Sequence, residues 1–128
     1  MRIETLAVAA ALASACGGSS NATTPTPSPC GSGPATTTIT ILNNAACPQN
    51  ITVPLGAQVL FVNQDTVAHE MYSDPHPEHT DCPELNQVGH LEPGQSRLSG
   101  NLNVARACGF HDHIRPDVAA LKGTITIQ

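Results

Sequence analysis

From Thr38 to the end of the chain, turn residues divide the sequence into runs that are short and often alternate between apolar and polar side chains. Asn43-Asn44 and Glu92-Pro93-Gly94 are typical turn signals. No stretch keeps a helical period over three turns. We therefore predict an all-β domain, a sandwich or barrel of about seven to eight strands. Strands are expected at 39–41, 51–53, 58–63, 67–73, 96–102, 107–111 and 123–127.

The core of such a domain must be aliphatic, because the 128 residues include one Tyr, two Phe and no Trp. Domains with thin cores often rely on disulfides or a bound metal. The formal net charge of −5 argues against nucleic acid, since phosphates attract basic surfaces. No nucleophile–base pair, phosphate-binding loop or pair of carboxylates points to a hydrolase, so we do not expect an enzyme.

The N-terminal part of the chain is expected to lie outside this domain. Residues 1–15 resemble an export signal, and Cys16 is the candidate for lipidation in a bacterial lipoprotein signal. Ordinary secretion with cleavage nearby is the alternative. Residues 16–37 are rich in Gly, Ser, Thr and Pro and are expected to form an extended tether. We therefore predict a folded domain over 38–128, held outside the cytoplasm (periplasm or cell surface) by a membrane anchor.

Metal-ligating side chains are concentrated near the end of the chain. Cys108, His111 and His113 lie within six consecutive residues. Imidazole and thiolate suit copper and zinc, and His-x-His can place two imidazoles on one side of an extended segment. A third imidazole, His69, follows the strand expected at 58–63. These residues predict a transition-metal site with copper as the first choice and zinc as the second.

Other residues are secondary candidates for this site. The segment 74–90 is expected to be a loop, and loops of that length usually have a function. Its His76 and His79 either bind the metal, cover the site or are solvated. Met71 is a further weak ligand candidate. Asp112 is expected to accept a ring N–H and so fix a histidine tautomer, and Asn63 to brace the loops through its amide.

Three patterns occur in a defined order and spacing: Val53–His69, Glu92–Ser96, and Cys108–His113 followed by Leu121–Ile127. Together they resemble the cupredoxin family, which includes plastocyanin and azurin, over about residues 38–128. The loop 73–81 is similar to that of bacterial cupredoxin-like lipoproteins. The resemblance implies a Greek-key β-sandwich with a mononuclear copper site at one end, single-electron transfer between extracytoplasmic partners, and His69 as the first ligand. It also implies that Leu121 occupies the place of an axial methionine.

The role of Cys108 is open between two alternatives. On an extended strand Cys108 and Asp112 share one face, while His111 and His113 take the other. Aligned in this way, the ligand-cysteine position of the family falls on Asp112. A bulge could still bring Cys108 to the metal as a thiolate. Otherwise it forms a disulfide, and a site made of imidazoles alone cannot be a blue copper site.

Cysteine counting favours the disulfide. If Cys16 is lipidated, four cysteines remain in an oxidising compartment, which is enough for two bridges. Three pairings are formally open. Cys30 with Cys47 would fasten the tether to the first strands, and Cys82 with Cys108 would fasten the long loop over the site.

These observations leave three functions to compare. The first is a membrane-tethered copper protein that carries single electrons to or from a redox partner. The second is a non-redox protein that stores, delivers or senses copper or zinc through histidines, with a copper donor or acceptor as its partner. The third is a metal-free β-sandwich interaction module. We expect a monomer and, for a histidine site, an affinity that falls below pH of about 6.5.

Overall fold

The structure is a computed structural model that describes residues 37–128. The predictions for the export signal at 1–15, for lipidated Cys16, for Cys30 and for all but the last residue of the tether lie outside the described residues. Within the described part of the chain, no helix has the length and apolar character needed to cross a membrane.

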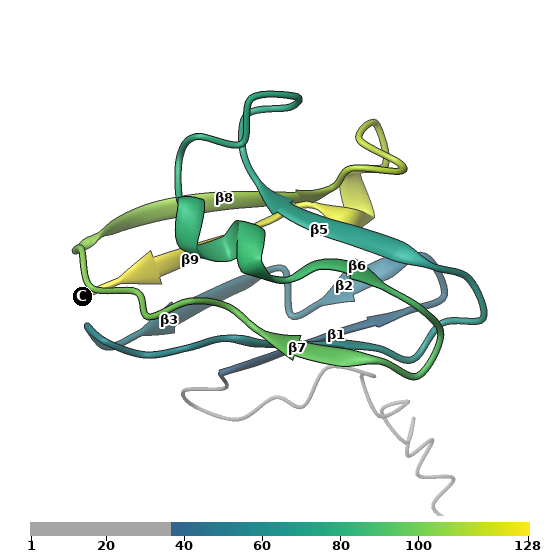
Figure 1. The fold of residues 1–128 in the computed structure, drawn as a ribbon, viewed down its shortest axis with the longest axis horizontal. Coiled ribbons are helices and arrows are strands. Elements are labelled where there is room, and N and C mark those ends of the chain that lie inside the picture. The colour runs from purple at the N-terminus through teal and green to yellow at the C-terminus, as the bar shows by residue number, and fades with distance from the viewer. Residues whose placement is uncertain (1–36) are drawn as a thin grey trace, which may run out of the picture.

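Nine strands form two facing sheets, which Figure 1 shows one above the other. The prediction of an all-β sandwich is confirmed. Two short strands were missed. One of them overlaps the end of the segment 74–90 that was predicted to be a loop, and a 3-10 helix lies within the same segment. The four-stranded sheet has the order β2 (Ala45–Cys47), β1 (Thr38–Leu42), β4 (Leu60–Asn63), β7 (Ser96–Leu98). The five-stranded sheet has the order β3 (Asn50–Val53), β9 (Gly123–Ile127), β8 (Arg106–Asp112), β5 (His69–Ser73), β6 (Gly89–Leu91), and the 3-10 helices are η1 (Pro83–Gln87) and η2 (Ala119–Leu121).

The first hairpin shows why its turn could be predicted and its second strand could not. Asn43 and Asn44 have φ angles of 51° and 59°, and Leu42 pairs with Ala45 across them. Two left-handed residues in a two-residue loop match the twist of the flanking strands, and asparagine tolerates this conformation. β2 itself reads Ala-Ala-Cys and lacks the β-branched residues that mark a strand.

The core lies between the two sheets and is mainly aliphatic, as the composition requires. Its one aromatic pair joins the sheets: Phe61 of β4 and Phe110 of β8 meet edge to face, with ring centroids 5.5 Å apart and an interplanar angle of 86°. This is a preferred geometry for aromatic rings. Burial of each such large side chain contributes about 1.5–3 kcal/mol.

β8 departs from simple alternation in a way that positions the site. Cys108, Phe110 and Asp112 are buried in the interior, as expected for one face of a strand. His111 belongs to the opposite, outer face, and yet only 1% of it is exposed. The chain between β5 and η1 covers it there, and Figure 1 shows this loop rising from the end of β5 above the sheet. The outer face of β8 is therefore partly enclosed by this loop, whereas the inner face lines the core.

Candidate metal centre

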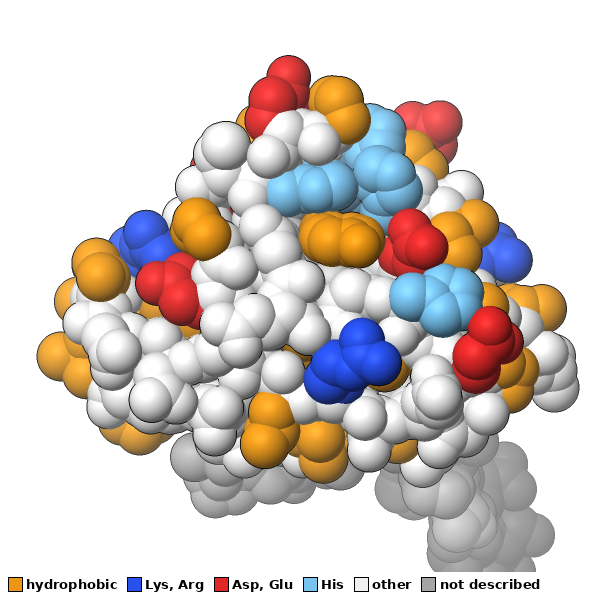
Figure 2. All heavy atoms as spheres, viewed as in Figure 1, with side chains coloured by type: hydrophobic (Ala, Val, Ile, Leu, Met, Phe, Trp, Pro, Cys, Tyr) orange, Lys and Arg blue, Asp and Glu red, His pale blue; other side chains and the backbone are white. Residues whose placement is uncertain are grey.

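Four imidazoles meet on the outer face of the five-stranded sheet. His76 and His79 come from the loop after β5, His111 from β8, and His113 from the residue after the strand's end. One ring nitrogen of each lies within 4.8 Å of those of the others. Nitrogens bound to one ion at about 2.0–2.1 Å are at most ~4 Å apart, so the rings need only a small closing movement to share an ion. We call these four residues the outer histidine group, and Figure 2 shows histidines gathered at this part of the surface.

His111 already has the hydrogen bonding of a metal ligand. Its Nδ1 lies 2.7 Å from Asp74 Oδ1. A carboxylate can only accept, so Nδ1 carries the proton and the lone pair is on Nε2. Nε2 is buried and has no hydrogen-bond partner, which is costly for a polar atom. A histidine that gives one ring N–H to a carboxylate and turns the other nitrogen to an ion is the usual arrangement in metal sites.

Gly109 makes room for this carboxylate. A Cβ at Gly109 would overlap Asp74 Oδ2 and would stand 2.8 Å from Asp74 Cγ. Real Cβ atoms do not approach other heavy atoms so closely, so the carboxylate lies against β8 only because residue 109 has no side chain. The backbone supports the same placement, since Asp74 N donates to Gly109 O at 3.0 Å.

His79 and His113 face each other through their ring nitrogens. His113 Nδ1 lies 3.1 Å from His79 Nε2, a separation suited to two nitrogens that bind the same ion. Tyr72 of β5 stacks on His79, with centroids 4.5 Å apart and an interplanar angle of 10°, and meets His113 edge to face at 5.5 Å. Burial lowers the pKa of His79, and the charges of the three other imidazoles lower it further. The neutral form, which binds metals, is therefore favoured.

His76 is the exposed member of the group. Its ring centroid lies 4.7 Å from that of His113 and 5.3 Å from that of His111. The group is thus closed on the side of the sheet by His111 and open to solvent on the side of His76.

His69 is not brought to this group, and the expected set of His69, His111 and His113 is corrected. His69 is fully buried inside the sandwich. Its Nδ1 lies 2.7 Å from Asp112 Oδ2 and its Nε2 lies 3.2 Å from Asp65 Oδ2. Arg115 Nη1 stands 3.6 Å from the same Asp112 oxygen. We call these four residues the inner cluster.

The inner cluster occupies the place where the family resemblance would put copper. The first ligand was expected at His69 and the cysteine position at Asp112, and these two side chains instead form a hydrogen-bonded pair. Both ring nitrogens of His69 face carboxylate oxygens, so neither nitrogen is free to bind a metal. A blue copper site does not fit these residues. Asp112, expected beside a metal-bound histidine, accepts from His69 and from the backbone N–H groups of Glu70 and Ile114.

The remaining residues considered for the site lie away from the outer histidine group. Met71 is buried in the core and does not belong to the histidine group. Leu121 is buried in the same core. Asn63 braces two neighbouring segments, since its Nδ2 lies 2.9 Å from both Val67 O and Leu91 O.

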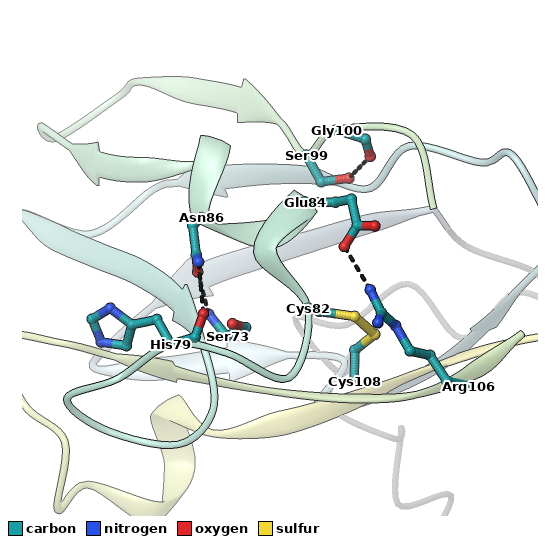
Figure 3. Close-up of a disulfide and its surroundings, with 9 residues drawn as sticks. All are labelled: Ser73, His79, Cys82, Glu84, Asn86, Ser99, Gly100, Arg106 and Cys108. Carbon is teal, nitrogen blue, oxygen red and sulfur yellow. Dashed lines mark hydrogen bonds and ion pairs between the residues drawn. A yellow bond between two sulfur atoms is a disulfide. The ribbon is translucent and has the colours of Figure 1, made fainter. Parts of the chain in front are cut away.

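Cys108 is bonded to Cys82, so the disulfide alternative is the one observed and the thiolate ligand is excluded. Figure 3 shows the bridge running between β8 and the start of η1. Cys47 is disulfide-bonded as well. Because Cys30 lies outside the described residues, its pairing with Cys47 stays a prediction.

Two residues of the centre were missed by sequence reasoning. Asp74 and Tyr72 gain their roles from the register of β5 against β8, in which Tyr72 lies opposite His111. Nothing in the local sequence specifies this register. The two histidines within the segment 73–81 are the sequence feature that points to this part of the centre.

The chain matches no protein-family model and no curated protein. Solved cupredoxin structures do resemble it: a purple cupredoxin from Nitrosopumilus maritimus has 18% identity and a TM-score of 0.55, covering 71% of this chain and 98% of that one. Oxidised plastocyanin from Dryopteris crassirhizoma has 22% identity and a TM-score of 0.55, covering 71% and 99%. The reduced Cu(I) form of an amicyanin mutant has 14% identity and a TM-score of 0.53, covering 71% and 80%. The shared feature is the fold.

Proposed function

We propose that this chain, which has the cupredoxin fold, is an extracytoplasmic copper-binding protein whose ion is held by the outer histidine group. One observation carries the proposal: four ring nitrogens converge within 4.8 Å, and that of His111 is buried without a partner while Asp74 holds the other side of its ring. The inner cluster, where the resemblance implied the metal, supports no such role.

The donor set favours Cu²⁺. All four donors are imidazole nitrogens, which suit copper, zinc and nickel, and Cu²⁺ binds such sites more tightly than Zn²⁺. Thiolate and thioether donors, which select Cu(I), are excluded here because Cys108 is in a disulfide and Met71 lies in the core. We infer that copper storage, delivery or sensing, with a copper donor or acceptor as partner, describes this site better than blue-copper electron transfer.

Each part of the centre has a distinct task. His111 is the fixed ligand, oriented by Asp74 before any ion arrives. His79 and His113 form the pair that closes around the ion, and Tyr72 holds the plane of His79. His76 is exposed and so offers the side from which the ion enters and leaves.

Copper titration of the dialysed protein tests the proposal. Tyr72 is the only tyrosine, and the chain has no tryptophan, so its fluorescence reports an ion bound beside His79. We expect one Cu²⁺ per chain, tyrosine quenching, and a pale complex whose electron paramagnetic resonance shows nitrogen ligands. His111→Ala should weaken binding by at least ~100-fold, since losing even a supporting partner of a metal ligand costs 10–100-fold.

His90→Ala is the matched control. His90 is an exposed histidine of β6 that bonds Glu70 and Glu92 and is not part of the group. Its removal should leave copper affinity unchanged. Equal losses in His90→Ala and His111→Ala, or an intense absorption near 600 nm, would contradict the proposal.

Electron transfer through the same histidine centre is the second candidate. Tyr72 favours it, because this ring touches two members of the group and reaches the surface of the outer face. Voltammetry of the copper protein distinguishes the two functions. A reversible one-electron wave that slows in Tyr72→Leu supports the carrier, and its absence supports storage or delivery. For either function we propose the lipid anchor at Cys16 as the link to the membrane.

A further inference from the structure

Each cysteine of the Cys82–Cys108 disulfide lies close in sequence to two members of the outer histidine group. His79 precedes Cys82 by three residues, and His111 follows Cys108 by three. The loop after β5 supplies His76 and His79, and β8 with its next residue supplies His111 and His113. A single covalent bond therefore joins the two half-sites, as Figure 3 shows for the His79 side.

At its first residue the loop is held to β8 by Asp74, whose N–H donates to Gly109 O and whose carboxylate accepts from His111 Nδ1. Beyond Asp74, the loop has little else to hold it against β8. From Asp74 to Asp81 every side chain is exposed or partly exposed, and Cys82 is the only buried residue between Ser73 and Leu85, a segment described throughout. Apolar burial is the main source of tertiary stability. Without the bridge, the segment that carries two of the four ligands has no buried anchor of its own.

The remaining polar contacts are placed differently. Asn86 bonds Ser73 N at 3.0 Å and His79 O at 2.8 Å, which ties the loop to β5 and η1 and not to β8. Arg106 of β8 pairs with Glu84 of η1 at 2.7 Å, but both side chains are partly exposed, so water screens this pair.

We propose that tight metal binding requires the oxidised Cys82–Cys108 disulfide, an inference that rests on the proposed function. In forming the bridge, the two thiols lose two electrons and two protons to a disulfide donor, which leaves as a pair of thiols. The bridge then holds the half-sites at a fixed distance and raises the effective concentration of one for the other. In a reducing compartment the half-sites are joined only by the chain. The protein therefore acquires its copper after export and oxidation.

The first experiment compares copper affinity with and without the bridge. The Cys82→Ser/Cys108→Ser double variant is titrated with Cu²⁺, using Tyr72 fluorescence, in the absence of reductant, because thiols bind copper and reductants change its oxidation state. We expect affinity to fall by about 10- to 100-fold. The control is Cys30→Ser/Cys47→Ser, which removes the disulfide of Cys47 on the other sheet together with its predicted partner, and it should leave affinity unchanged.

The second experiment uses the unaltered protein, and so decides the question even if the serine variant does not fold. Both sulfurs are buried, so a reductant reaches them only when the loop opens. An ion that links the half-sites should hold the loop closed. With saturating Zn²⁺, reduction of Cys82–Cys108 by a water-soluble phosphine, followed by alkylation and mass spectrometry, should slow at least ~10-fold. Reduction of the bridge at Cys47 provides the internal control.

The outcomes separate the two proposals. If the oxidised protein takes up no copper or zinc, the proposed function fails. If it binds metal but the folded serine variant binds equally well, or if Zn²⁺ does not protect the bridge, only the proposed dependence of binding on the disulfide fails.

Discussion

The inner cluster and the outer histidine group both pair a buried histidine with an aspartate, but they differ in whether the second ring nitrogen of that histidine has a partner. In the inner cluster, His69 has a carboxylate oxygen at 2.7 Å on one ring nitrogen and another at 3.2 Å on the other. In the outer group, His111 has one carboxylate, at 2.7 Å, and a second nitrogen with no partner. Both ring nitrogens of His69 therefore have hydrogen-bond partners, and its role is structural. His111 keeps a lone pair directed toward three other imidazoles.

This difference follows from the side of β8 on which each partner stands. Asp112 points into the sandwich and meets His69, whereas His111 points outward and meets the loop. One residue of offset in a strand reverses the face. A carboxylate beside a histidine thus does not by itself indicate a metal site. A second ring nitrogen that also has a partner indicates a structural role, and one without a partner marks a candidate ligand.

Asp112→Ala is expected to have the largest effect, and it is confined to the inner cluster. It leaves buried His69 and the Arg115 guanidinium without their shared partner, which typically costs about 3–5 kcal/mol. Urea unfolding of the metal-free protein measures this loss. The protein that remains folded should bind copper as the wild type does. A fall in copper affinity comparable to that of His111→Ala would mean that the two regions are not independent.

Gly109→Ala is expected to have a smaller effect, and it is confined to the outer group. The new methyl group displaces the Asp74 carboxylate and frees the His111 ring, so copper affinity should fall by about 10- to 100-fold. Calorimetric titration measures it. Asp74→Ala should cause a similar loss, and the double variant should lose little more, because both changes remove one contact. Additive losses would show that Gly109 acts in another way.

The smallest expected effect is an opposite pH dependence at two histidines of the metal-free protein. Burial lowers the pKa of His79, so the unfolded chain binds this proton more readily, and stability falls as pH drops below about 6.5. The hydrogen bond to Glu92 raises the pKa of His90, so its contribution is present below about 6.5 and is lost as pH rises through the raised pKa.

Denaturant midpoints of His79→Gln and His90→Gln between pH 5 and 8 measure these contributions. Relative to the wild type, the His79 variant should gain stability on acidification and the His90 variant should lose it. The same sign for both would contradict the environments described for these rings.

Much of the fold was predictable because its signals are local. Alternation and turn residues predicted most of the strands, and Asn43-Asn44 predicted the turn of the first hairpin. The missed strands, β2 and β6, are three residues long and gain their pairing from neighbours and not from their own composition. The candidate site was predicted less well: His111 and His113 belong to the outer histidine group, whereas His69 does not.

The sequence by itself determined an all-β chain with a thin aliphatic core, cysteines placed for bridging, and a supply of imidazoles near two strand ends. Only the tertiary structure decided which imidazoles share a site, because this depends on the register of β5 against β8 and on the loop that folds back over the outer face. Alternation assigns a side chain to a face. It cannot say whether that face will meet a carboxylate, another ring or water, since those partners come from distant parts of the chain.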